Sequence, residues 1–145
     1  MKIAVFMGGI SSEREVSLNS GKEILESLLK QGYDAYGIDV TKENLVSAFI
    51  ENKYDFAYLA FHGGFGEDGR VQGLLDMLGK PYTGSGAEAS GIAMDKVITK
   101  RLAESAGVRL AKNYDKVSNM DSYSDVIKPA LEGSSVVIFF CYNTV

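Results

Sequence analysis

The stretch KIAVFMGG, residues 2 to 9, sets the pattern that predicts the fold. Its first six residues favour a β-strand, and the pair Gly8-Gly9 ends the run. Apolar residues then recur near helical spacing over residues 18–29, and this helix pattern stops at Gly32. A strand that leads into a helix is the first half of a βαβ unit.

The same alternation continues along the chain. The run FAYLAF at 56–61 is apolar enough for a strand covered on both faces of its sheet. Thr41 is placed to cap a short helix, and a longer helical region is expected to break near Gly91. Strand patterns cover 33–40, 56–61 and 81–83, and helix patterns cover 42–52, 71–78 and 87–107. Strands that alternate with helices predict an α/β fold with a parallel sheet.

Composition and charge argue against several classes of function. The chain has 145 residues, 46% of them apolar, and a net charge of −4 with scattered lysines and arginines, so no basic stripe suggests nucleic-acid binding. No apolar run reaches the roughly 18 residues of a membrane span, and the N-terminus has the pattern of a strand rather than a signal peptide. The single cysteine, Cys141, excludes an internal disulfide and a multi-cysteine metal site. We therefore expect a cytoplasmic protein without nucleic-acid or membrane partners.

The C-terminal part has a different pattern. Residues 112–125 are polar and have the character of a connection between two units. A strand, a Gly-Ser turn and the very apolar strand 136–142 follow. An apolar strand without partners at a chain end would be prone to aggregation. We therefore expect the chain to stop inside a second domain, or this last strand to pair with a partner that the sequence does not show. The alternative is that 136–142 is a central strand of the first sheet.

Three loops rich in glycine and polar residues follow predicted strands. They are GGISSERE at 8–15, HGGFGEDG at 62–69 and TGSG at 83–86. Ligands of parallel α/β sheets bind beyond the carboxyl ends of the strands, where these loops would meet. The sequence therefore predicts a ligand site at this rim.

The first loop contains two acids with different interpretations. Ser12 and Glu15 have the spacing of a helix capping box, and we favour that interpretation for Glu15. Glu13 is not needed for the box. An acid is favourable at any helix N-terminus, and the functional alternative for Glu13 is to receive an ammonium group.

The second loop contains a formal G-x-G-x-x-G match at 64–69, which we reject as a dinucleotide fingerprint. That fingerprint belongs in the first βα turn, and here Glu67 and Asp68 would lie where a pyrophosphate binds. We expect the two acids to cap the next helix instead. His62, at the strand end, is a functional candidate, with an ordinary structural histidine as the alternative.

Two lysines and a Gly-Ser loop complete the candidates. Lys96 lies on a predicted helix, where exposed lysines are common, so the sequence alone gives it no role. Lys128 precedes EGSSV at 132–136. This segment is either a plain turn or a loop that covers phosphates with N–H groups, hydroxyls and a cation.

Five motifs together closely resemble those of the D-alanine–D-alanine ligases. In chain order they are MGGISSEREVSLNSG, HGGFGEDGRVQG, PYTGSG, MDK and KPALEGSSV. The resemblance covers about residues 1–110 and resumes at 127–136. It implies an ATP-grasp enzyme of bacterial cell-wall synthesis. A Rossmann-like substrate-binding domain would occupy 1–93, and the beginning of an incomplete ATP-grasp domain would occupy 94–145.

The resemblance also implies roles for individual residues. Glu13 would engage the ammonium group of the first D-alanine, with Val16 and Ser17 in the same pocket. His62 would lie near the carboxylate of that D-alanine and the site of phosphoryl transfer. A serine, Ser134, would hydrogen-bond the substrate-binding glutamate and share its catalytic assignment. The residues implied at the ATP phosphates are Lys96, Lys128, Ser134 and Ser135.

The family activity would join two D-alanine molecules through an acyl phosphate, with ATP and Mg²⁺, and the family commonly forms homodimers. The sequence departs from the family in three ways. The segment 111–127 is short, Val137 replaces a glycine, and the magnesium ligands have no counterpart. We therefore expect the chain alone to be inactive. The alternatives are a non-catalytic small-ligand-binding α/β module and a ligase whose second substrate is D-lactate or D-serine.

Overall fold

The computed structural model of the chain describes residues 1–112, 125–131 and 139–141. The chain divides into two compact units, Met1–Gly91 and Ile92–Val145. Each unit contains its own sheet. The functional domain boundary predicted between residues 93 and 94 stays a prediction.

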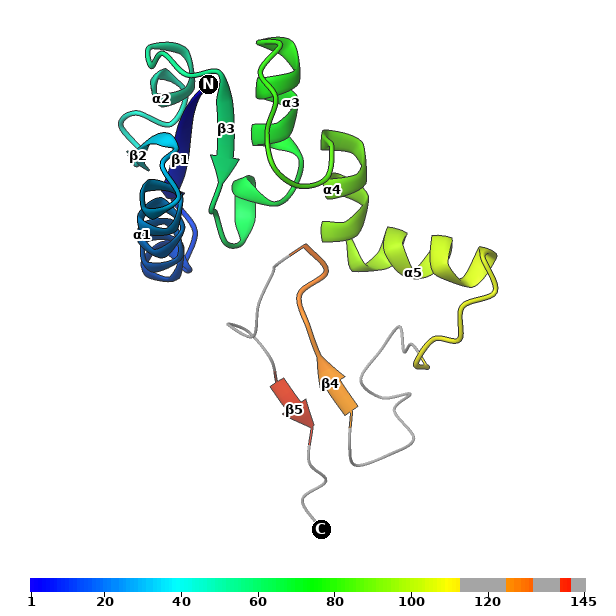
Figure 1. Cartoon of the computed structure of the whole chain (residues 1–145). Coiled ribbons are helices and arrows are strands. Elements are labelled where there is room, and N and C mark those ends of the chain that lie inside the picture. Colours follow the sequence, from blue (N-terminus) through cyan, green and yellow to red (C-terminus); the bar gives the residue numbers. More distant parts are fainter. Residues whose placement is uncertain (113–124, 132–138, 142–145) are drawn as a thin grey trace. The chain divides into compact units, whose positions relative to one another are not determined.

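The first unit contains a parallel sheet of three strands in the order β2-β1-β3 (Figure 1). Ile3, on the central strand, lies opposite Ala35 on one side and Phe56 on the other. This confirms the predicted parallel α/β sheet, and it brings the carboxyl ends of the three strands to one edge. The strands are β1 (Lys2–Gly8), β2 (Asp34–Val40) and β3 (Phe56–Leu59). The helices are α1 (Arg14–Lys30), α2 (Ser47–Ile50), η1 (Gly64–Gly66) and α3 (Arg70–Met77), and α4 (Ala87–Met94) runs on into the second unit.

The central strand β1 is buried along both faces of the sheet. Consecutive side chains of a strand point to opposite faces, so β1 contributes to a separate apolar cluster on each face. Val5 and Met7 join an apolar cluster with leucines of α1. Ala4 and Phe6 join the larger cluster on the other face, where the ring of Phe6 stacks on Phe49 of α2 at 4.5 Å. A strand with two covered faces needs apolar residues at every position, which explains the uninterrupted run in its sequence.

The third strand is shorter than predicted, and the segment after it pairs only briefly. β3 ends at Leu59, whose N–H donates to the hydroxyl of Thr83 at 2.9 Å. The strand predicted at 81–83 forms an isolated bridge between Ala57 and Tyr82. A side-chain hydroxyl therefore replaces the next main-chain partner of the ladder.

The helix predicted at 42–52 is reduced to the single turn of α2. The N–H of Thr41 donates to Oδ1 of Asn44 at 2.6 Å, and the Thr41 hydroxyl accepts the N–H of Glu43 at 3.2 Å. These bonds favour a turn in place of the first helical residues. The prediction that Thr41 caps the helix is therefore wrong.

The break in the last helical region falls at Asp95 rather than near Gly91. Gly91 lies inside α4, and α5 (Lys96–Ser105) begins after Asp95, whose carboxylate accepts the N–H groups of Val97 and Ile98 at 2.8 and 3.0 Å. The N-cap hydrogen bonds of Asp95 stabilise the start of a new helix at this point, whereas Gly91 is accommodated inside α4.

The second unit contains α5 and a strand pair. β4 (Asp125–Ile127) runs antiparallel to β5 (Phe139–Cys141), with Val126 opposite Phe140. The two strands form a separate sheet, so the alternative that the terminal apolar strand belongs to the first sheet is wrong. Val137, the residue that departs from the family pattern, lies outside the described residues.

Candidate functional site

The loops after β1 and β3 meet at the rim of the first sheet through one hydroxyl group. Oγ of Ser11 donates to the carbonyl oxygen of His62 at 2.6 Å and accepts the N–H of Glu13 at 3.1 Å. The third predicted loop begins at Thr83, which holds the end of β3. The parallel order of the strands thus brings Glu13 and His62 into one region, as the rim argument predicts.

The carboxylate of Glu13 lies against the backbone of Gly63. A Cβ atom built on Gly63 would collide with Oε2 of Glu13, and Gly63 has a φ of +67° that favours glycine. The N–H of Gly63 donates to Oε2 of Glu67 at 2.8 Å. Glycine at position 63 therefore allows the Glu13 carboxylate to approach the loop closely.

The two acids of the second loop do not both cap α3. Glu67 closes its own loop on Gly63, so the capping prediction is wrong for Glu67. Oδ1 of Asp68 accepts the N–H of Arg70, the first residue of α3, at 3.1 Å. The N-cap residue itself is Gly69, which has a φ of +92° and makes no side-chain bond to the helix.

The imidazole ring of His62 is held from α1. Its Nε2 lies 3.0 Å from Oγ of Ser20, and both side chains are half-buried. The sequence reasoning did not select Ser20. The available signal was its position three residues after Ser17, which places both hydroxyls on one face of α1.

Ser17 and Val16, which the resemblance places in one pocket, lie in different surroundings. Ser17 is fully buried, and its hydroxyl accepts the N–H of Gly8 and donates to the carbonyl oxygen of Ala60, both at 2.8 Å. Val16 is 50% exposed. The Ser17 hydroxyl therefore ties the ends of β1 and β3 together beneath the rim.

The predicted capping box of Ser12 and Glu15 is wrong. The N-cap of α1 is Glu13, and the Glu13 side chain makes no capping hydrogen bond to the helix. Ser11, rather than Ser12, supplies the hydroxyl that binds the N–H of Glu13, because the same hydroxyl also reaches His62. Glu15 is exposed in the first turn of α1.

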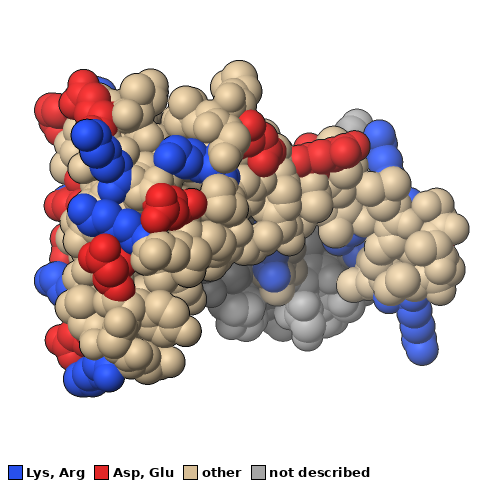
Figure 2. Space-filling model, turned by 45° about the horizontal axis from the view of Figure 1, so that its top comes forward, with Lys and Arg blue, Asp and Glu red and all other residues tan. Residues whose placement is uncertain are grey.

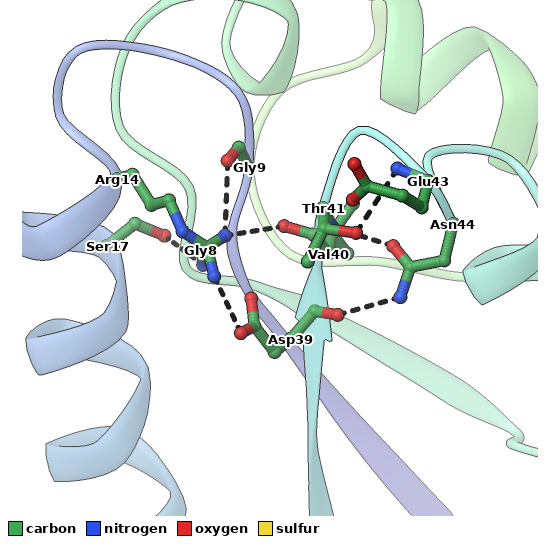
Figure 3. A network of polar contacts seen from close by, with 9 residues as sticks. All are labelled: Gly8, Gly9, Arg14, Ser17, Asp39, Val40, Thr41, Glu43 and Asn44. Carbon is green, nitrogen blue, oxygen red and sulfur yellow. Dashed lines mark hydrogen bonds and ion pairs between the residues drawn. The ribbon is translucent and has the colours of Figure 1, made fainter.

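Arg14 anchors the start of α1 to the ends of two strands (Figure 3). Its Nη1 donates to the carbonyl oxygens of Val40 at 2.8 Å and Gly9 at 3.2 Å, and its Nη2 lies 2.7 Å from Oδ2 of Asp39. The hydrogen bond that the Arg14 guanidinium donates to Asp39 raises the pKa of Arg14. Sequence reasoning missed Arg14, although a cation in the first turn of a helix is unfavourable to the helix dipole and so suggests another use.

The predicted phosphate-binding residues lie in the second unit. The backbone N–H of Lys96 donates to the carbonyl oxygen of Ala130 at 3.0 Å, which links the start of α5 to the segment after β4. Lys128 lies in that same segment and is exposed. Ser134 and Ser135 lie outside the described residues.

Three general features concern partners and cofactors. Figure 2 shows acidic and basic side chains intermixed over the face that it presents. In the described parts of the chain, no three His, Cys, Asp or Glu side chains gather closely enough to hold a metal ion. None of the described helices is both long and apolar enough to cross a lipid bilayer.

Comparisons with known proteins agree on one family. A family model described as the D-ala D-ala ligase N-terminus matches residues 2–47 and 45–85. A D-alanine–D-alanine ligase of Fusobacterium nucleatum is 56% identical over 143 residues, which cover 99% of this chain and 50% of that protein. A second one, of Citrifermentans bemidjiense, is 51% identical and is matched by 93% of this chain over 46% of its length.

Solved structures give the same result. The crystal structure of the D-alanine–D-alanine ligase from Bacillus anthracis has a TM-score of 0.81 at 38% identity, over 99% of this chain and 50% of that one. A crystal structure of the Bacillus anthracis ligase complexed with ATP has a TM-score of 0.76 at 36% identity, with the same coverage. The chain spans about half the length of the curated relatives it matches.

Proposed function

The chain belongs to the D-alanine–D-alanine ligase family, and from this premise we propose that it provides the first-substrate site of an ATP-dependent ligation of two D-alanine molecules. The observation that carries the proposal is the Ser11 bridge, which holds Glu13 and His62 at one rim. The reaction would supply a precursor of peptidoglycan in the bacterial cytoplasm, with D-alanine and ATP as the partners.

The chemistry requires an activated carboxylate, because a free carboxylate is a poor electrophile. The carboxylate oxygen of one D-alanine attacks the γ-phosphorus of ATP, ADP leaves, and an acyl phosphate forms. The amine of the second D-alanine then attacks the acyl carbon, loses a proton and expels inorganic phosphate. Positioned cations and N–H groups stabilise the charge during phosphoryl transfer, and exclusion of water protects the acyl phosphate.

Two rim residues would bind the first substrate. The Glu13 carboxylate, half-buried beside Gly63, would receive the ammonium group of the first D-alanine. The His62 ring would lie near the carboxylate that becomes phosphorylated. Val16 would border the pocket, and Ser17 would act through the backbone by fixing the strand ends.

The candidate phosphate-binding residues lie in the second unit. We assign Lys96 and Lys128 to the ATP phosphates, together with Ser134 and Ser135, which lie outside the described residues. Magnesium accompanies ATP in such reactions and takes oxygen ligands. The described residues contain no carboxylate cluster that fits it.

The first test is calorimetric titration of the chain with D-alanine, with L-alanine as the stereochemical control. Glu13→Gln should weaken D-alanine binding by roughly tenfold to a hundredfold, since a charge-assisted hydrogen bond is lost. Glu15→Gln is the matched control, because it removes the same charge from an exposed position two residues away. Equal affinity of Glu13→Gln and the unsubstituted chain would overturn the site.

Phosphate release from ATP distinguishes the remaining alternatives. Because this chain alone is expected to be inactive, D-alanine binding without phosphate release agrees both with the proposed function and with a module that only binds its ligand. Phosphate release with D-alanine by a chain extended to the length of the relatives would separate the two. Release that rises with D-lactate or D-serine as second substrate, but not with additional D-alanine, would indicate a ligase with a different product.

A further inference from the structure

We propose that Ser20 is a positioning residue for His62, which holds the imidazole ring through Nε2 so that Nδ1 is the ring nitrogen that meets the ligand. The direct observation is the distance of 3.0 Å between Oγ of Ser20 and Nε2 of His62. This inference rests on the proposed function, because it assigns a ligand to the His62 ring.

Ser20 is carried by a rigid part of the molecule. The next residue along α1, Gly21, is buried, and a Cβ atom built there would lie 2.5 Å from Cβ of Met7 on β1. The helix therefore packs directly on the sheet at this level, and its backbone at Ser20 cannot shift toward the sheet without displacing that contact. Side chains on helices that pack this closely hold their partners more accurately than side chains on loops.

The backbone of His62 is fixed independently of its ring. Oγ of Ser11 holds the His62 carbonyl oxygen, and two residues earlier Ala60 binds both the Ser17 hydroxyl and the carbonyl oxygen of Phe6. With the backbone fixed, the remaining freedom of His62 is rotation of its side chain, and the χ2 torsion of histidine has a broad energy profile. The hydrogen bond between Oγ of Ser20 and Nε2 of His62 selects one orientation of the ring.

A hydroxyl group is suited to this role because it can both donate and accept a hydrogen bond. Ser20 can therefore hold Nε2 whether that nitrogen carries a proton or not. The two ring nitrogens of histidine are distinct, and the one already bonded to protein determines which one is left for a ligand. Here Ser20 occupies Nε2, which leaves Nδ1 for the substrate carboxylate or the phosphoryl group.

Nuclear magnetic resonance of the His62 ring tests the hydrogen bond directly. His62 is the only histidine in the sequence, so ¹⁵N-labelled histidine gives one pair of ring nitrogen signals without further assignment. Ser20→Ala should shift the Nε2 signal more than the Nδ1 signal, and Ser20→Thr should restore it. The matched control is Ser27→Ala on the same helix, where the exposed hydroxyl bonds Gln31 at 3.1 Å and lies away from His62.

The Ser27→Ala spectrum should show both ring signals unchanged. A Ser20→Ala spectrum in which neither nitrogen signal moves would overturn the proposal. Alanine favours helix more than serine does, so Ser20→Ala should fold, and thermal unfolding of the variant verifies this.

Calorimetric titration with D-alanine tests the positioning role. Ser20→Ala should weaken binding by about threefold to tenfold, and Ser20→Thr should bind as the unsubstituted chain does. Unchanged affinity in Ser20→Ala, together with a shifted Nε2 signal, would overturn the positioning role. D-alanine should also shift Nδ1 more than Nε2, and the reverse order would overturn the assignment of Nδ1.

The two proposals can fail separately. If the unsubstituted chain binds no D-alanine, the proposed function and the positioning role both fall. The ring spectrum of Ser20→Ala would still decide whether the Ser20–His62 hydrogen bond exists. If D-alanine binds and depends on Glu13 but not on Ser20, the proposed function stands and this inference alone is wrong.

Discussion

The two units hold their candidate site residues in different ways. The first unit surrounds Phe6 with fully buried neighbours, and long-range hydrogen bonds attach the rim loops to that core. In the second unit, no residue of 92–112 or 126–131 is buried, and Val97, Ile98 and Leu102 of α5 are between 43% and 49% exposed. The comparison indicates that core packing fixes Glu13 and His62, whereas local capping fixes the start of the helix that carries Lys96.

The largest expected effect comes from Phe6→Ala, which removes the ring stacked on Phe49. We expect the free energy of unfolding of the first unit to fall by about 3–5 kcal/mol, because a large buried side chain leaves a cavity. Leu102→Ala on α5 is the counterpart in the second unit and should cost less than about 1 kcal/mol. Urea unfolding followed by circular dichroism measures both, and equal losses would remove the contrast between the units.

The next prediction compares Gly63→Ala with Gly79→Ala, and each substitution is expected to cost less stability than Phe6→Ala. Both glycines have positive φ, +67° at Gly63 and +63° at Gly79. Each substitution should therefore lower the free energy of unfolding by roughly 1–2 kcal/mol through backbone strain. Gly79 has nothing within 4 Å of a built Cβ, whereas at Gly63 the Cβ would collide with the Glu13 carboxylate.

D-alanine affinity separates the strain from the collision. Titration calorimetry should show a loss of about tenfold or more for Gly63→Ala and no change for Gly79→Ala. Equal affinities in the two variants would mean that the position of Glu13 does not depend on Gly63.

The smallest expected effect is local to the second unit. Asp95→Ala removes the carboxylate that accepts the N–H groups of Val97 and Ile98, which should cost about 1 kcal/mol of helix stability. Hydrogen exchange of the α5 amides should accelerate while exchange of the β1 amides stays the same. Asp95→Asn retains a capping oxygen and should exchange as slowly as the unsubstituted chain. Faster exchange in β1 would show that the two units are not independent in this respect.

Sequence reasoning predicted the first sheet well because its strands are apolar runs that end at glycine or polar residues. It was less accurate where one polar side chain decides between a turn and a helix. The bond between Thr41 and Asn44 shortens α2, and the cap at Asp95 places the break four residues after Gly91. Average propensity contains no information on which of these particular hydrogen bonds will form.

The site was predicted in its location but not in its internal connections. The rim argument brought Glu13 and His62 together from strand order alone. Ser20, which holds the His62 ring, and Arg14, which anchors the start of α1 beside Glu13, bond to partners 42 and 25 positions away in the sequence. Rules based on local sequence spacing cannot predict contacts over such separations. The capping box failed for the same reason, because Ser11 has a long-range partner that a local pattern cannot include.

The Ser11 bridge has a consequence for how such a chain can evolve. Surface loops usually tolerate insertions and deletions. Here a single oxygen atom joins two loops whose bonded residues are 51 positions apart, so a change of length in either loop would break the connection with the other. The two loops are therefore expected to keep their lengths together across related chains, even where the residues between them vary.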